Sequence, residues 1–156
     1  MLKRFKKFVK NQKGLTLVEL LAVIVILGII AAIAVPSIGG IIENSKTDAH
    51  IANAKQLVAA AKLAEASNLT TEAISHTLAG GTSSTSSPGY KLSTLVSNKY
   101  ITDITDPDQK TSVYLGDSYV LKYNNKYYIF LDGNVKNVGA VTLPVEMNSI
   151  ERTNVN

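Results

Sequence analysis

The distribution of apolar residues along the chain is very uneven, and its longest apolar run lies near the N-terminus. Residues 20–36 include neither a charged nor a hydroxyl side chain. At a rise of 1.5 Å per residue they form about 25 Å of helix, and with residues 15–19 in front the helix can cross a hydrocarbon core of ~30 Å. The pattern therefore predicts a membrane-spanning helix close to this end.

A second helical pattern continues from Ile41 to about Ala66, where apolar and polar residues are mixed. Joined to the apolar run, it predicts a single helix over residues 15–68, of roughly 50 residues and ~75 Å. Apolar residues that recur at intervals of three and four mark the face of this second half that is expected to be buried. These residues are Leu57, Val58, Ala61 and Ala64.

The predicted helix has a weak part near its middle. Pro36 removes a backbone hydrogen bond and crowds the preceding turn. Gly39 and Gly40 follow, and each costs about 1 kcal/mol relative to alanine in a helix interior. A simple kink at Pro36 and a local loss of helix between Gly28 and Gly40 both fit this pattern.

Short elements are predicted after the long helix. Residues 70–78 are expected to form a helix capped by Thr70 or Thr71, and residues 92–100 a second one. Between them, residues 80–89 consist mainly of glycine, serine and threonine. Such a composition buries little apolar surface, so an exposed loop is expected there.

The last third of the chain has the composition of β-strands. Residues 118–123 and 126–131 are rich in β-formers and are separated by Asn124-Asn125, which favours a tight turn. Further strands are predicted over residues 135–138 and 140–143, before a patternless and exposed tail. The predicted fold is therefore α+β, a long N-terminal helix packed on an antiparallel sheet of three to four strands. Five of the seven tyrosines lie in or beside these strands, where packing is favoured over an adhesive patch.

The charges divide the chain into a basic leader and a nearly neutral remainder. Six of the sixteen lysines and arginines precede Leu15, which leaves ten basic against twelve acidic residues, a net charge of −2. A basic patch for nucleic acid is therefore not expected. The basic flank predicts that residues 1–14 stay in the cytoplasm, with the head, residues 69–156, on the outer side.

The sequence has none of the usual signs of an enzyme. Phosphate-binding glycine loops, nucleophile elbows, paired catalytic carboxylates and cofactor fingerprints do not occur in it. Without cysteine, neither a disulfide nor a thiolate metal site can form. His50 and His76 have no ligand at a metal-binding spacing, so both are expected to be ordinary exposed histidines on helices. No catalytic residue and no cofactor are predicted.

Glu19 is the one residue with unusual surroundings, because it lies at the entrance to the apolar run. A cleaved signal peptide, with Ala32-Ile33-Ala34 as its cleavage pattern, leaves this charge unexplained, and so does an uncleaved signal anchor. A third interpretation explains it. If the chain is cut after Gly14, Leu15 acquires an ammonium group, and the Glu19 carboxylate of one chain can pair with the ammonium of the next.

On these residues the chain resembles the bacterial type IV pilins and pseudopilins. The resemblance covers residues 1–42 closely: a basic leader ending in Gly14, the sequence Leu-Thr-Leu-Val-Glu, and an apolar helix with Gly28 and Pro36. It implies that a prepilin peptidase cuts between Gly14 and Leu15 and that Glu19, Gly28 and Pro36 act in assembly. The family usually has phenylalanine where this chain has Leu15, which leaves methylation of the new amine open.

The resemblance also implies a function, location and partners. It predicts a structural subunit that waits in the membrane as a single-pass precursor and then joins an extracellular filament for adhesion or motility. Its partners would be copies of itself and related pilins, the prepilin peptidase, and an assembly platform with a motor ATPase. A pseudopilin of a type II secretion or DNA-uptake system and a membrane-anchored or secreted binding module remain alternatives. The absence of the cysteines that close a C-terminal loop in many Gram-negative pilins favours a Gram-positive source.

One acidic segment is a weak candidate for calcium. Asp103, Asp106 and Asp108 offer oxygen ligands, and some pseudopilins hold calcium in a nearby loop. Their spacing differs from that of a calcium-binding helix-loop-helix, and turn-forming aspartates are the favoured interpretation.

Overall fold

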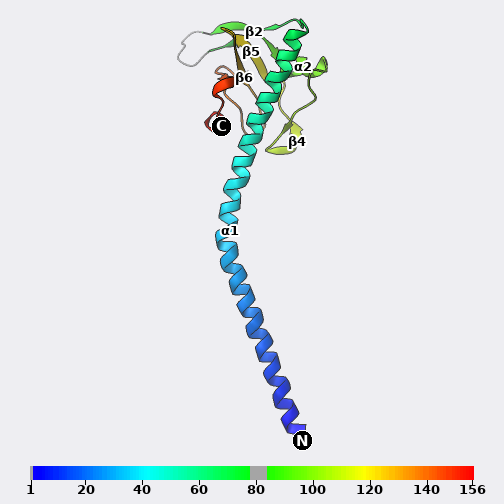
Figure 1. Cartoon of the computed structure of the whole chain (residues 1–156), viewed down its shortest axis with the longest axis vertical. Coiled ribbons are helices and arrows are strands. Elements are labelled where there is room, and N and C mark those ends of the chain that lie inside the picture. The colour runs from blue at the N-terminus through cyan, green and yellow to red at the C-terminus, as the bar shows by residue number, and fades with distance from the viewer. Residues whose placement is uncertain (1, 78–83) are drawn as a thin grey trace. The chain divides into compact units, whose positions relative to one another are not determined.

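The computed structural model describes the backbone of residues 2–77 and 84–156, and the side chains of residues 16–77 and 84–156. The chain begins with helix α1, Leu2–Ala66, and continues into an antiparallel sheet with short helices (Figure 1). Two compact units can be distinguished, Met1–Glu43 and Asn44–Asn156. The first is the apolar part of α1, and the second combines the end of α1 with every other element. The predicted α+β fold, a long N-terminal helix on an antiparallel sheet, is confirmed.

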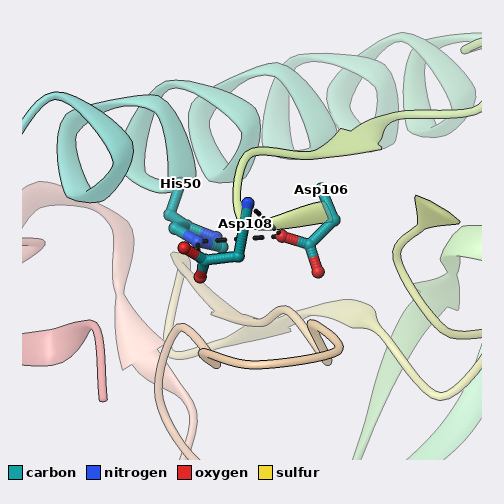
Figure 2. A group of neighbouring side chains, drawn as sticks. All are labelled: His50, Asp106 and Asp108. Atoms are coloured by element: carbon teal, nitrogen blue, oxygen red, sulfur yellow. Dashed lines mark hydrogen bonds and ion pairs between the residues drawn. The ribbon is translucent and has the colours of Figure 1, made fainter. Parts of the chain in front are cut away.

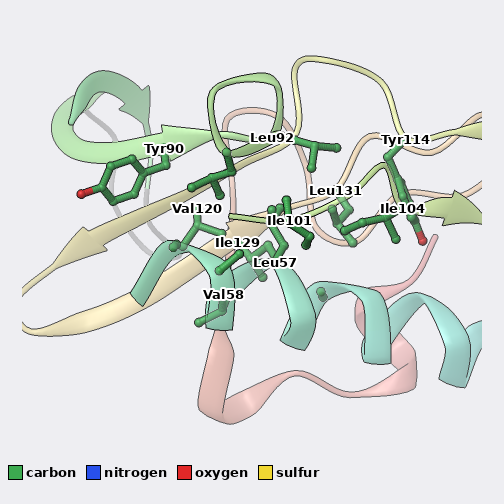
Figure 3. Close-up of a cluster of buried hydrophobic side chains, with 14 of the residues drawn as sticks. Leu57, Val58, Tyr90, Leu92, Ile101, Ile104, Tyr114, Val120, Ile129 and Leu131 are labelled. Carbon is green, nitrogen blue, oxygen red and sulfur yellow. The ribbon is translucent and has the colours of Figure 1, made fainter. Parts of the chain in front are cut away.

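The core of the second unit lies between α1 and the sheet (Figure 3). The predicted stripe of α1 is buried as expected, with Leu57, Ala61 and Ala64 at 0% exposure and Val58 at 1%. These side chains share one cluster with residues of the sheet and of the segments beside it, among them Tyr90, Leu95, Val120, Ile129 and Leu131. The helical spacing of three and four thus identified the face that packs on the sheet.

Helix α1 ends in a turn that its last residues explain. Asn68 has φ +56°, a left-handed conformation that asparagine tolerates better than most residues. The backbone N–H groups of Asn68 and Leu69 donate to the carbonyls of Glu65 and Ala64 at 3.0 Å, which satisfies two carbonyls of the last turn. The Tyr90 hydroxyl, from the sheet, then donates to the Leu69 carbonyl at 2.9 Å.

The main sheet is antiparallel throughout and has the strand order β1-β2-β5-β6-β7. A two-stranded sheet, β3-β4, lies between its second and third strands in the sequence. The strands are β1 Glu72–His76, β2 Thr85–Lys91, β3 Thr105–Asp106, β4 Gln109–Val113, β5 Tyr119–Tyr123, β6 Lys126–Phe130 and β7 Val145–Glu146. The remaining elements are helix α2, Leu92–Ser97, and the 3-10 turns η1, Met147–Ser149, and η2, Arg152–Asn154.

The elements with strong local signals lie where they were predicted. Helix α2 falls inside residues 92–100 and buries Leu92 and Leu95. Strands β5 and β6 form the predicted hairpin, and Asn124 and Asn125 at its tip have φ +48° and +61°. Positive φ at both turn residues matches the twist of two antiparallel strands, which is why an asparagine pair suits this position.

Two predictions between α1 and α2 were wrong. Residues 72–76 of the helix expected at 70–78 form strand β1, and residues 85–89 of the loop expected at 80–89 belong to strand β2. Residues 78–83 lie outside the described part. A Cβ atom on Gly89 would lie 2.4 Å from the Val120 carbonyl oxygen and 2.6 Å from Ile74 Cδ1. Glycine at this position therefore lets β2 fit between β1 and β5. The sequence did not indicate this close approach, because the residues around Gly89 have the composition of a loop.

The predictions for the C-terminal segment also need correction. Residues 135–138 and 140–143 form isolated bridges, Leu131 with Val138 and Ala140 with Leu143, and the edge strand is β7. Gly139, at φ +77°, separates the two segments. With β1 and β2 added, the main sheet has five strands where three to four were expected.

The tail is more organised than its lack of pattern suggested. Asn137 and Asn156 exchange two backbone hydrogen bonds, at 2.7 and 3.0 Å, and Val155 packs against the core. The Arg152 guanidinium donates from Nε and Nη2 to both carboxylate oxygens of Asp48, at 2.7 and 2.5 Å. These contacts connect the end of the chain to α1, and such long-range pairs leave no periodic signal in sequence.

Candidate functional site

The first unit carries an apolar surface that its own chain does not cover. Every leucine, isoleucine and valine from Leu17 to Ile42 is between 51% and 73% exposed. The most apolar window of 18 residues has a mean hydropathy of 3.0, and none of it is buried. Length and composition suffice for this helix to cross a membrane. A continuous apolar surface of this size requires lipid or other apolar helices around it.

The structure places all the predicted processing and assembly residues on α1. Gly14 and Leu15 belong to its backbone, and Glu19 is exposed on its apolar part. Pro36 lies inside the same helix. Among the described residues, a Cβ added at Gly28 would meet nothing within 4 Å.

Comparison with known proteins identifies this segment. Residues 9–35 match the prokaryotic N-terminal methylation motif. This range includes Gly14, Leu15, Glu19 and Gly28, and it ends one residue before Pro36. The methylation motif thus covers the predicted cleavage point and the start of the apolar surface.

The chain is also similar to fimbrial protein Q of Moraxella bovis, with 44% identity over 81 residues. The match covers 46% of this chain and 52% of that protein, so the chain spans about half the length of the curated relative it matches. No solved structure matches the chain at a significant level. The methylation motif and the similarity to a fimbrial protein together support the type IV pilin family. They point to a structural protein rather than an enzyme. The motif and the apolar N-terminal helix also fit a membrane-anchored precursor.

A second candidate group lies in the second unit and combines His50 with Asp106 and Asp108 (Figure 2). The two aspartates were weak calcium candidates in the sequence, whereas the place of His50 beside them was missed. Nε2 of His50, on α1, lies 3.0 Å from Oδ2 of Asp108 and 3.9 Å from Oδ1 of Asp106. The side chains of His50 and Asp106 are 0% exposed and that of Asp108 is 5% exposed. Asp103, the remaining calcium candidate, is exposed and outside this group.

The expectation that both histidines are exposed on helices was therefore wrong. His50 does lie on a helix, but it precedes Ala54 by four residues and Leu57 by seven, and so belongs to the buried stripe. That spacing could have predicted its burial. His76 lies on β1, is 1% exposed, and has an Nε2 atom without a hydrogen-bond partner among the described residues.

Hydrogen bonds orient each member of the His50 group. The Tyr114 hydroxyl lies 2.6 Å from Nδ1 of His50, and the two rings meet edge to face. The backbone N–H groups of Asp108 and Asn134 donate to the two carboxylate oxygens of Asp106, at 2.9 and 2.7 Å. Lys46 Nζ lies 3.2 Å from Asp108 Oδ1.

Burial and hydrogen bonding act on the pKa values of this group in different ways. Burial raises the pKa of Asp108, but the hydrogen bonds from His50 and Lys46 outweigh it and hold that pKa below its ordinary value. Burial raises the pKa of the Tyr114 hydroxyl far above its usual range, so this group stays protonated at all physiological pH values.

A third polar group joins the end of α1 to the sheet. The Glu65 carboxylate accepts hydrogen bonds from Lys122 Nζ at 2.6 Å and from the Tyr127 hydroxyl at 2.5 Å. Lys62 and Lys122 lie over the Tyr127 ring, 5.0 and 5.4 Å from its centre. Two hydrogen bonds lower the pKa of Glu65 below its ordinary value of 4.5. The one from Lys122 has the larger effect, and the one from Tyr127 the smaller.

This lowered pKa predicts a pH dependence of stability. The pKa of Glu65 is lower in the folded chain than in the unfolded chain. The ionised carboxylate therefore contributes its full share to the free energy of unfolding above pH 4.5, and this share is lost as the pH falls through the folded pKa. Replacing Glu65 by glutamine should lower the free energy of unfolding at pH 7 by about 1 kcal/mol or less, since the pair is partly exposed. Urea unfolding at pH 7 and pH 3 tests this. The difference between the wild type and E65Q should be smaller at pH 3 than at pH 7, and an equal difference at both values would contradict the assignment.

Proposed function

We propose that this chain is the structural subunit of a type IV pilus-like filament. The observation that carries the proposal is the uncovered apolar surface of residues 17–42 with one carboxylate, Glu19, at its start. The methylation motif over residues 9–35 and the similarity to a fimbrial protein support it. Residues 1–14 would be the leader, residues 15–68 the helix that spans the membrane and later forms the filament core, and residues 69–156 the head.

The proposed sequence of events follows from the chemistry of this segment. A prepilin peptidase cuts between Gly14 and Leu15 and creates an ammonium group four residues before Glu19. In a bundle of copies, the Glu19 carboxylate pairs with the ammonium group of a neighbour, so that neither charge is left alone among apolar side chains. Other helices replace the lipid around residues 17–42, and the apolar surface stays out of water before and after assembly.

Gly28 and Pro36 are the other two residues that we propose to act in assembly. Gly28 would allow a neighbouring helix to approach, because a Cβ there meets nothing in its own chain. Pro36 would let the helix adjust on assembly, since it provides no backbone donor. Extraction from the membrane would be performed by an assembly platform with a motor ATPase, and related pilins would join the same filament.

The processing step can be tested by determining the N-terminus of the mature chain by mass spectrometry. Leu15 as the first residue is the expected result; Val35 would indicate ordinary signal peptidase and Met1 an uncleaved anchor, and either would overturn the proposal. G14V should leave Met1 at the N-terminus, whereas the small side chain of G14A should permit cleavage.

Electron microscopy of sheared surface material, labelled for this chain, should show filaments. Label that stays on the cell membrane would support a binding module that does not polymerise.

A further inference from the structure

The His50 group combines one imidazole and two carboxylates in a buried part of the second unit. Asp106 and Asp108 bring two carboxylates into a site where the exposed fraction of each side chain is 5% or less. Lys46, whose side chain is 36% exposed, forms an ion pair with Asp108, and His50 Nε2 lies 3.9 Å from Asp106, beyond hydrogen-bond distance. A buried carboxylate is costly unless a cation or a metal ion accompanies it.

We infer that this group binds a divalent transition-metal ion of the Zn²⁺ class, through Nε2 of His50 and one oxygen each of Asp106 and Asp108. These three atoms lie within 4.8 Å of one another. At metal–ligand distances of ~2.0–2.2 Å, the ligands of a tetrahedral ion are about 3.3–3.6 Å apart. The distances from Nε2 to the two carboxylates, 3.0 and 3.9 Å, bracket this value. Small rotations of the side chains complete the site, with a fourth position left for water.

The donor atoms favour this class of ion over calcium. Calcium takes six to eight oxygen ligands, whereas this group presents one imidazole nitrogen and two carboxylates. Asp103, which would add a further oxygen, is exposed and outside the group. The proposed site therefore differs in its ligands from the calcium site considered for Asp103, Asp106 and Asp108, because it includes His50 and excludes Asp103.

The surrounding hydrogen bonds suit a metal ligand at each position. With the ion on Nε2, Nδ1 of His50 carries the proton and donates to the Tyr114 hydroxyl oxygen, 2.6 Å away. Asn134 N–H holds the second oxygen of Asp106 at 2.7 Å. Metal-binding histidines and carboxylates are commonly oriented by such partners. The ion would connect α1 to the turn between β3 and β4, and its binding would stabilise the fold.

The test uses the full chain in detergent, without a polyhistidine tag, after EDTA treatment and dialysis. Titration with ZnCl₂ should show one ion per chain by calorimetry and raise the unfolding temperature. H50Q should weaken Zn²⁺ binding by more than the ~10- to 100-fold that loss of an outer partner costs. H76Q is the matched control, because His76 is equally buried but outside the group, and it should bind Zn²⁺ like the wild type.

Two results would overturn the inference. One is a wild-type chain that shows no saturable heat and no thermal shift with Zn²⁺. The other is binding that H50Q leaves unchanged, or that CaCl₂ reproduces equally in the wild type and H50Q. Should H50Q fail to fold, the visible spectrum of the Co²⁺-loaded wild type decides: four-coordinate bands support the site, and the spectrum of hydrated Co²⁺ contradicts it.

Discussion

Cells that produce the Glu19→Val variant are expected to have no surface filaments, although the chain still enters the membrane and is still cut after Gly14. Valine fits the apolar surface of residues 17–42, so insertion is not impaired. In the proposed bundle, however, the ammonium group of each neighbouring Leu15 loses its carboxylate. Removing one partner of a buried ion pair costs about 3–5 kcal/mol. A loss of that size at every contact lowers the association constant by more than about 100-fold.

The measurement is the amount of this chain in sheared filaments relative to the membrane fraction, with the mature N-terminus determined in parallel. Glu43→Gln is the matched control, because it also removes a glutamate from α1 but lies beyond the apolar run, and it should leave filament yield unchanged. Glu19→Asp keeps the charge on a shorter side chain and should restore part of the yield. Normal filaments from Glu19→Val would contradict the pairing of Glu19 with the new N-terminus.

The Leu57→Ala variant should lose about 2–5 kcal/mol of unfolding free energy. Leu57 is 0% exposed and belongs to the cluster between α1 and the sheet. Truncating it removes buried apolar area and leaves a cavity that the surrounding strands fill only in part. Because a domain of this size is marginally stable, such a loss would consume much of its stability.

Chemical unfolding of the full chain in detergent, followed by the near-ultraviolet signal of the tyrosines, measures this loss. Leu63→Ala provides the control, since Leu63 lies on the same helix but is 56% exposed. The control should change the free energy of unfolding by no more than about 0.5 kcal/mol. Equal effects of the two substitutions would show that α1 does not pack on the sheet through the face that contains Leu57.

Features that depend on neighbouring residues could be predicted from the sequence. The apolar run needs only its own length to indicate a membrane helix, and the stripe that includes Leu57 needs only helical periodicity. Asn124-Asn125 indicated a hairpin because a tight turn is decided by the φ angles of two residues. The segment around Gly14 and Glu19 carried the resemblance to type IV pilins, and residues 9–35 match the N-terminal methylation motif. Cleavage after Gly14 stays a prediction.

Features that depend on distant residues were decided only by the tertiary structure. Residues 85–89 look like a loop, yet they form a strand because β1 pairs with all of them and β5 pairs with residues 89–91, where Gly89 permits the close approach. His50 and Asp106 are 56 positions apart in the sequence, and they meet only because the β3–β4 turn packs on α1. Local pattern thus determined the long helix and the N-terminal methylation motif, whereas the strand partners and the buried group of His50, Asp106 and Asp108 depend on which segments the folded chain brings together.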